Sequence, residues 1–362
     1  TASGAENPST GGHGMIRATL FAGLLASAAV WADDVPRTQD GKPDLSGFYD
    51  IATLTPLERP RIFGDSETIT KEQAETIASR AAAGRIAASQ NSDPERGAPP
   101  QGGDGSRGAA GNVGGYNAFW IDNGVNTVQV DGKFRTSLVT SPKNGRLPKM
   151  LPAAADKRRK YISRFRHNEG VAWWLEVTGK GPYDDPESLT LSDRCLVGFG
   201  STAGPPMLPV LYNNLKKIVQ TPEHVMILTE MVHDARIIRL NADHLPAHMT
   251  SYLGDSIGHW VGDTLIVDTT NFNGKAGIRG GSENLHVVER FRMVDKDTVI
   301  YSFTVEDATV WEAPWSGEYP WPRSDQVVYE YACHEGNYAM GNILRGARLL
   351  EQDALKAQAG GL

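Results

Sequence analysis

A mainly β fold is what this sequence predicts: an antiparallel, closed or nearly closed β-barrel preceded by a short helical, loop-rich N-terminal part. From about residue 116 onward, apolar residues recur with a period of two, which is the period of strands. The chain has Gly 39 and Pro 21 in 362 residues, a content that suits tight turns between strands better than a helical bundle. Glycine-rich dinucleotide and P-loop fingerprints between a strand and a helix are absent from the sequence, so a nucleotide-binding fold is not expected.

The first 32 residues are not expected to belong to the fold. Residues 1–14 are polar and rich in Gly and Ser, and we interpret them as a tag or leader. Residues 15–32 have the pattern of a signal peptide, with Arg17 before the apolar stretch Ala18–Val30 and small residues after it. That stretch of 13 residues is too short to cross a hydrocarbon core of about 30 Å. We therefore expect a periplasmic or secreted protein whose mature chain has no membrane span.

Residues 33–115 are expected to hold an extended segment, one helix and a flexible loop. Thr70 and Gln73 form the pattern of a capping box, which predicts a helix that begins there and ends near Ala88. Residues 93–115 are rich in Gly and Pro and have almost no large apolar side chain, so they predict a mobile loop.

Residues 116–350 are expected to form the barrel, and residues 351–362 a C-terminal tail. Asp131 and Gly132 separate two alternating runs and predict a hairpin with a tight turn. Further runs with a period of two predict strands at Val225–Thr229, Arg236–Leu240, Thr264–Thr270, His286–Met293, Thr298–Glu306 and Gln326–Cys333.

Charge and cysteine content narrow the function classes. Lys and Arg total 36 against 43 Asp and Glu, so the net charge is −7. This balance argues against a general nucleic-acid or anionic-membrane binder, which needs clustered positive charge. Cys195 and Cys333 cannot build a four-cysteine zinc site, but in an exported protein they are expected to form a disulfide. Closing a loop of more than 130 residues would add roughly 3–5 kcal/mol of stability, whereas the alternative is two separate buried thiols.

Acidic and imidazole side chains recur on the predicted strands, on the same faces as aliphatic residues. Asp268 shares a face with Ile266, and Glu289 shares one with Val287 and Phe291. By the same alternation we place Glu230 with Met226 and Leu228, His233 with Ile227 and Met231, and Glu330 with His334. A buried charge is costly unless it is paired or functional, so this density favours a functional site, although satisfied structural ion pairs are the alternative for each residue.

Two groups stand out as candidate catalytic sites. Glu230, His233, Asp234 and Arg236 lie at a strand end or turn, where barrel mouths place functional groups. The second group is His334 and Glu335, which follow Cys333 at the end of the last predicted strand. A disulfide from Cys333 to Cys195 would hold them beside Arg194. A His with a carboxylate partner can act as a general base and an Arg can stabilise an oxyanion, although these residues could equally be hydrogen-bonded contacts at the barrel rim.

Substrate contacts are expected mainly from aromatic and polar residues near the barrel mouth. Residues 311–322 are interpreted as an aromatic loop held by prolines, which either stacks on a flat ligand or caps the barrel as a small core. The residues expected to bind substrate are Tyr116, Asn117, Trp120, Asp268, Glu289, Trp311 and Trp315.

Metal and serine chemistry have weaker support. His244 and His248 have the i, i+4 spacing, but Pro246 breaks the helix that would align their rings. We therefore expect no cofactor. The alternative is a divalent metal held by His233, His334 and a carboxylate. The sequence has no Gly-x-Ser-x-Gly nucleophile elbow.

Several motifs resemble a large family of exported bacterial proteins. They begin at Pro43 (PDLSG), Tyr116 (YNAFW), Asp193 (DRC), Gly204 (GPPMLP), Gly262 (GDTLIVDTTNF) and Tyr331 (YACHEGNY). The resemblance covers most of the chain that follows the signal peptide. It implies a lipocalin-type or related calycin β-barrel, in agreement with the strand pattern.

The function that we expect is an exported enzyme doing cofactor-independent acid–base chemistry, as a lyase, isomerase or hydrolase, on a small hydrophobic or aromatic molecule in the barrel cavity. His233 and His334 would carry protons, Glu230 and Glu335 would be their partners, and Arg236 or Arg194 would stabilise the oxyanion. The alternatives are a non-catalytic periplasmic carrier of a lipophile or glycan, and a carbohydrate-active enzyme that uses a carboxylate pair.

Overall fold

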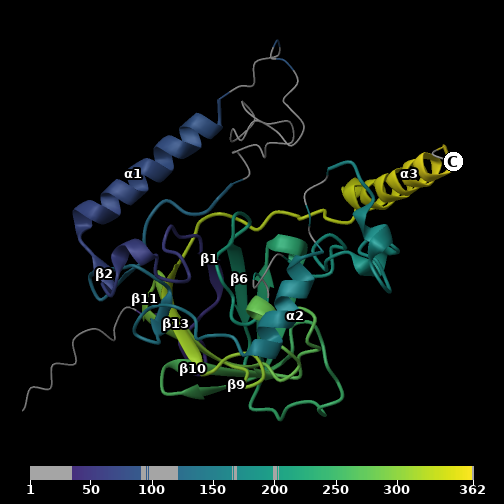
Figure 1. Cartoon of the computed structure of the whole chain (residues 1–362). Coiled ribbons are helices and arrows are strands. Elements are labelled where there is room, and N and C mark those ends of the chain that lie inside the picture. Colours follow the sequence, from purple (N-terminus) through teal and green to yellow (C-terminus); the bar gives the residue numbers. More distant parts are fainter. Residues whose placement is uncertain are drawn as a thin grey trace, which may run out of the picture. The chain divides into compact units, whose positions relative to one another are not determined.

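Ten strands form one strongly curled sheet in the computed structural model, which describes residues 35–90, 95, 97, 121–164, 166, 169–198, 202 and 204–360. In their order across the sheet the strands are β1 (Gly47–Asp50), β6 (Leu215–Gln220), β7 (His224–Thr229), β8 (Ala235–Leu240), β9 (Asp255–Val261), β10 (Thr264–Thr270), β11 (His286–Asp295), β12 (Thr298–Glu306), β13 (Trp315–Pro322) and β5 (Val139–Ser141). Neighbouring strands are antiparallel except β8 and β9, which are parallel. Figure 1 shows β1 beside β6 and β9 beside β10, as this pairing requires.

The sheet is a half-barrel and does not close, so the expectation of a closed barrel is wrong. Its two edge strands, β1 and β5, have only four and three residues, which leaves few backbone groups to join the edges. Among the described residues, the backbone contacts between β1 and the end of β13 are the isolated bridge between Tyr49 and Arg323 and a bond from Ser324 N to Phe48 O (2.9 Å). β5 pairs with the start of β13, at Ser316 and Gly317, and beyond it Pro320 and Pro322 have no N–H to offer another strand.

The inner face of the curled sheet is filled with aromatic side chains and holds the core. Trp315, Tyr319 and Trp321 lie on the same face of β13 and are fully buried. Across the strand pair, Tyr301 faces Tyr319 with ring centroids 5.6 Å apart and perpendicular planes. Trp311 is 3% exposed and packs edge-on against Trp315 at 6.0 Å.

Residues 315–322 therefore form a core strand, and the expected aromatic loop at a barrel mouth is wrong in its secondary structure. The alternation Trp315, Gly317, Tyr319, Trp321 turns one side of the strand inward, while the prolines lie on the other side. The interpretation of these aromatics as core residues agrees with their burial.

Most strands that the alternation predicted are present, with ends that differ by a few residues at most. β10 and β12 have the predicted bounds, and β7, β8 and β11 are each extended by one or two residues. The hairpin at Asp131 and Gly132 is also confirmed, because both residues have positive φ (48° and 73°) between β3 (Gln129–Val130) and β4 (Lys133–Arg135). These strands and β2 (Thr68–Ile69) form a separate three-stranded sheet.

The predicted strand Gln326–Cys333 is wrong, because this segment is not paired with any described strand. Val327 and Tyr329 give the segment an alternating pattern, but their side chains are 51% and 72% exposed. Side-chain hydrogen bonds and a disulfide hold it in place of a strand ladder, as described below.

The described residues also form three α-helices. α1 (Lys71–Ala88) begins at the predicted capping box, in which Thr70 and Gln73 each accept a hydrogen bond from the other's backbone N–H. α2 (Pro152–Ile162) and α3 (Tyr338–Gly360) lie where the sequence predicted barrel and tail. None of the helices in the described part of the chain combines the length and apolar character needed to cross a membrane. The expected signal peptide lies outside the described residues, as does most of the expected Gly-rich loop.

Candidate functional site

A strained turn joins β7 to β8 and carries three of the predicted site residues. β7 ends at Thr229, so the alternation used to place Glu230 and His233 on strand faces does not extend to them. Val232 and His233 have φ of 60° and 45°, in the left-handed region that side-chain-bearing residues rarely adopt. Conformations of this kind cost on the order of 1–3 kcal/mol each and persist only where the surroundings enforce them.

The segment 324–337, which we call the strap, encloses this turn. Glu230 Oε1 accepts a hydrogen bond from Tyr329 N (3.2 Å), and His233 Nδ1 lies 3.1 Å from Tyr331 O. Because a carbonyl oxygen only accepts, His233 Nδ1 carries the proton. Both side chains therefore hold the strap.

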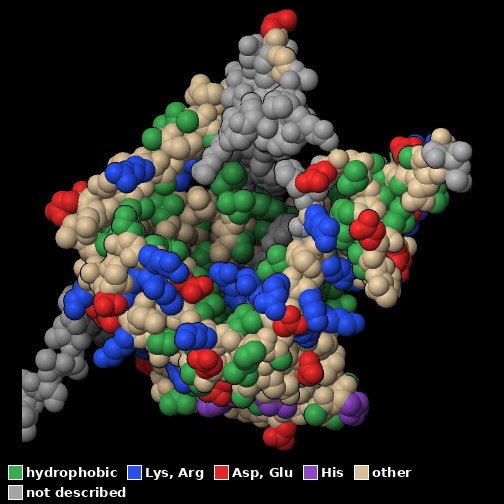
Figure 2. All heavy atoms as spheres, viewed as in Figure 1, with side chains coloured by type: hydrophobic (Ala, Val, Ile, Leu, Met, Phe, Trp, Pro, Cys, Tyr) green, Lys and Arg blue, Asp and Glu red, His purple; other side chains and the backbone are tan. Residues whose placement is uncertain are grey.

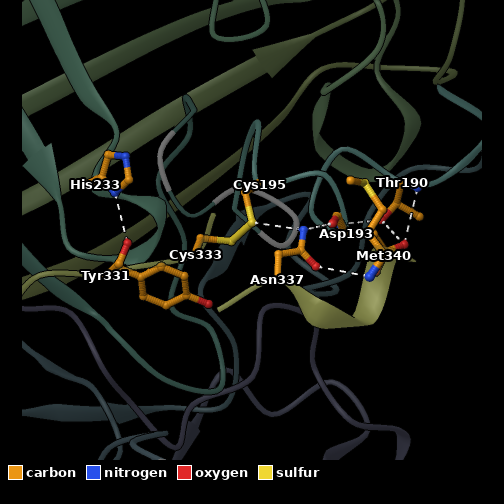
Figure 3. Close-up of a disulfide and its surroundings, with 8 residues drawn as sticks. All are labelled: Thr190, Asp193, Cys195, His233, Tyr331, Cys333, Asn337 and Met340. Carbon is orange, nitrogen blue, oxygen red and sulfur yellow. Dashed lines mark hydrogen bonds between the residues drawn. A yellow bond between two sulfur atoms is a disulfide. The ribbon is translucent and has the colours of Figure 1, made fainter. Parts of the chain in front are cut away.

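The expected disulfide between Cys195 and Cys333 is confirmed, with Cα atoms 5.8 Å apart and a sequence separation of 138. Figure 3 shows the disulfide joining the strap to the loop that contains Cys195, with His233 directed at the Tyr331 carbonyl. Asn337 Nδ2 also donates to Asp193 O (2.7 Å), so the strap is fixed on both sides of the disulfide.

The second predicted group lies apart from any cavity described here. His334 and Glu335 are exposed in the turn that follows Cys333, and neither side chain makes a hydrogen bond or ion pair with the described residues. Arg194 is half-buried beside Cys195. The disulfide brings these residues near one another, as the sequence led us to expect for Arg194.

A buried lysine, Lys216, lies at this end of the sheet, and the sequence did not identify it as a site residue. It lies on β6 opposite Thr229 and on the same inward face as Ile218. It is fully buried, and Nζ has no hydrogen-bond partner among the described residues. Burial lowers the pKa of Lys216 to about 7, although the negative charges of Glu230, Asp234 and Asp50 act in the opposite direction.

The pKa of Asp234, at the end of the turn, is also shifted toward neutral pH, but upward instead of downward. Burial raises the pKa of Asp234 to about 6, while a backbone hydrogen bond from Gly198 and the charges of His233 and Lys216 lower it. Its Oδ2 atom is buried and has no hydrogen-bond partner within the described part of the chain. Lys216 and Asp234 are thus an interacting base and acid whose pKa values both lie close to pH 7.

A small cavity of about 280 Å³ opens beside Asp234. The residues that line it include Asp234, Arg236, Tyr252, Leu253 and Ser256. The volume is near the lower end of small-molecule sites, which are about 300–1,000 Å³.

Arg236 is held rigidly at this cavity by a buried polar network. Its guanidinium forms a bidentate ion pair with Glu289, and its Nε donates to Ser256 Oγ (3.0 Å). Tyr301 OH donates to Glu289 Oε1 (2.7 Å), and burial together with that carboxylate raises the pKa of Tyr301 well above its usual value. Glu289 lies on the inner face with Val287, as its alternation predicted.

Asp268 lies on the outer face of the sheet, away from this cavity. It accepts hydrogen bonds from His244 Nε2 and His286 Nε2, each at 3.0 Å. His244 Nδ1 lies 2.9 Å from Asp255, which also pairs with Arg239. We call these five residues the outer histidine–carboxylate chain.

The remaining predicted substrate residues that the structure describes do not line this cavity. Trp311 and Trp315 are buried in the core, and Tyr116, Asn117 and Trp120 lie outside the described residues. Lys216 was missed because the pair Lys216-Lys217 reads as an exposed strand segment until β6 is placed between β1 and β7.

Within the described residues, no group of three or more His, Cys, Asp and Glu is arranged to hold a metal ion. Comparison with known proteins gives no match to a family model, a curated protein or a solved structure.

Proposed function

We propose that this protein is an enzyme that performs acid–base chemistry on a small molecule in the cavity beside Asp234, without a cofactor. The observation that carries the proposal is a buried carboxyl oxygen on Asp234 that has no hydrogen-bond partner among the described residues, on a side chain whose pKa of about 6 suits a general base near neutral pH. Lys216 is a positioning residue, because its positive charge favours the ionised form of Asp234 from inside the core.

The reaction class that fits this arrangement is proton abstraction next to a carbonyl group. The Asp234 carboxylate takes a proton from the carbon, and the electron pair of the broken C–H bond moves onto the carbonyl oxygen. Arg236 lines the same cavity and would stabilise the resulting enolate oxygen. Return of the proton to another position completes an isomerisation, and loss of a β-substituent completes an elimination.

The proton carrier in this proposal is Asp234 in place of the histidines that the sequence suggested. His233 Nδ1 is engaged by the strap, and His334 is exposed on the far side of the disulfide. Asp234 has both an unpartnered oxygen and a place on a cavity wall.

We further propose that the protein is exported. The disulfide supports this proposal, because disulfides form and persist in oxidising compartments. The filled inner face of the sheet gives less support to a carrier that holds its ligand inside a barrel.

The proposal is tested by hydrogen–deuterium exchange into small carbonyl compounds in D₂O. Pyruvate, phenylpyruvate and acetophenone are incubated with the wild-type protein, with Asp234→Asn and with Asp243→Asn, an exposed carboxylate control. Mass spectrometry should show enzyme-dependent exchange at the α-carbon that falls at least about 100-fold in Asp234→Asn and is unchanged in the control. Exchange that survives in Asp234→Asn would contradict the assignment, and absence of exchange on all three compounds would count against enolisation.

A further inference from the structure

A second and larger cleft, of about 700 Å³, lies beside α2. Its walls combine apolar side chains, among them Leu191, Val197 and Val310, with the glycine-rich loop at 274–281. Four cationic residues also line it, and Figure 2 shows Lys and Arg side chains gathered over the part of this face where Figure 1 draws α2. The four are Lys157, Arg158, Lys275 and Arg279.

These four cations stand out because the chain as a whole is acidic, with a net charge of −7. Among the described residues, Glu283 is the single acidic residue that lines the cleft, and none of the four cations forms an ion pair. The next two residues of α2 behave differently, since Arg159 and Lys160 pair with Asp156 at 2.6 and 2.9 Å. The four cations of the cleft therefore have no ion-pair partner among the described residues, whereas Asp156 offsets part of the charge on the adjacent helix face.

The loop that contributes half of this charge is fixed in place. Ser282 donates to Asp307 from its backbone N (2.7 Å) and from its Oγ (2.8 Å). A Cβ at Gly277 would lie 2.4 Å from Gly281 O, so the loop can close this tightly only with glycine there. A loop held in this way presents its side chains to a ligand without a large ordering cost.

Arg279 occupies a backbone position that favours glycine. Its φ is 51°, and its neighbours on both sides are a buried Ile278 and Gly280. It lines the cleft and also a neighbouring cavity of about 570 Å³. An arginine kept in a strained conformation between two cavities points to a function of its side chain.

We propose that this cleft binds an amphiphilic organic anion, with its carboxylate, sulfonate or phosphate group on the four cations and its apolar body on the opposite wall. The inference goes beyond the proposed acid–base function and holds whether or not Asp234 is catalytic. The two sites are neighbours, because Val197 lines both this cleft and the smaller cavity beside Asp234.

Two fluorescent probes that differ only in the anionic group provide the test. These are 8-anilinonaphthalene-1-sulfonate and its uncharged analogue N-phenyl-1-naphthylamine, each titrated into the full chain at low and at 0.5 M salt. The sulfonate should bind at one site at least tenfold more tightly than the neutral probe, and salt should weaken its binding. Equal affinity for the two probes would overturn the proposal.

Matched variants locate the binding. Lys157→Ala/Arg158→Ala should weaken binding of the sulfonate about tenfold, while Arg159→Ala/Lys160→Ala on the same helix should change it less than twofold. Arg279→Gly should also weaken binding severalfold, without lowering the melting temperature, because glycine accepts the positive φ. Unchanged affinity in both cleft variants would overturn the proposal, and because both positions are exposed these variants are expected to fold.

Discussion

At the scale of single residues, burial brings the pKa values of one acid and one base close to neutral pH. It raises the pKa of Asp234 and lowers the pKa of Lys216. Burial disfavours the charged forms of both side chains, and neither the Lys216 ammonium nor one Asp234 oxygen has a hydrogen-bond partner among the described residues. Their mutual attraction offsets part of each shift. If the Asp234 carboxylate is the base and the Lys216 ammonium supports it, activity should be greatest between pH values of about 6 and about 7.

Replacing Lys216 by Met should remove a pH dependence of stability. In the unfolded chain the pKa of Lys216 returns to 10.5, whereas in the folded protein it is about 7. Between these values the unfolded chain binds a proton that the folded protein does not, so the wild-type protein should become more stable as pH rises through this window. We expect its melting temperature to increase by on the order of 5 °C from pH 6.5 to 9.5, and Lys216→Met to lack this increase.

The neighbouring Lys217 provides the control for that experiment. It is partly exposed on the opposite face of β6, with Nζ 5.3 Å from the centre of the Phe48 ring. Lys217→Met should keep the wild-type slope in thermal unfolding followed by circular dichroism. The interpretation fails if Lys216→Met keeps it as well.

The sequence predicted part of this site by residue type and position. Glu230, His233, Asp234 and Arg236 were grouped because they follow a strand, and the structure does gather them at one turn. It could not predict which of them would be engaged by the strap, because the strap is almost 100 residues away and reaches the turn through backbone atoms. Nor could it identify Lys216, whose burial depends on β1 pairing beside β6.

At the scale of elements, side-chain bonds on the outer face add to the backbone ladders that pair β9, β10 and β11. The outer histidine–carboxylate chain joins the loop after β8 to β9, β10 and β11. His244 uses both ring nitrogens on carboxylates, so it is the central link between Asp255 and Asp268.

Cutting this link should destabilise the protein by a moderate amount. His244→Ala removes bonds to two carboxylates and is expected to lower the free energy of unfolding by about 1–2 kcal/mol in urea titrations. His259→Ala, an exposed histidine on β9 outside the chain of bonds, should change it by less than about 0.5 kcal/mol. Equal effects of the two substitutions would show that the chain contributes no stability.

Strand bounds were predicted most accurately where a period of two coincided with a turn signal. β10 and β12 have both features. β13 was missed because its prolines suggested a loop, although its inward residues alternate perfectly. Gln326–Cys333 was predicted as a strand from its alternation alone, which cannot show whether a partner strand is available.

At the scale of the whole molecule, curvature and one long-range covalent bond organise the fold. The half-barrel stays open because its edge strands are short, and closure could not be predicted because it depends on contacts between distant edges. The disulfide was predictable from composition and expected compartment. It joins residues 138 positions apart and ties the strap across the turn that carries Asp234.

Removing the disulfide should therefore lower stability and loosen the turn. Cys195→Ser/Cys333→Ser is expected to lose roughly 3–5 kcal/mol in urea unfolding, because the unfolded chain gains the freedom of a long loop. Hydrogen exchange should become faster at Tyr329 and in residues 230–234, while β12 amides remain protected in the native state. A variant as stable as the wild type, with unchanged exchange at the turn, would contradict this role of the disulfide.

The proposed chemistry requires that Asp234 titrate near neutral pH under the influence of Lys216. The most direct measurement is a ¹³C NMR titration of aspartate carboxyl groups, with the Asp234 signal assigned by its loss in Asp234→Asn. We predict a pKa of about 6 in the wild-type protein and a higher value in Lys216→Met, where the neighbouring positive charge is gone. An Asp234 signal that titrates near the usual 3.8 and does not respond to Lys216→Met would contradict the claim.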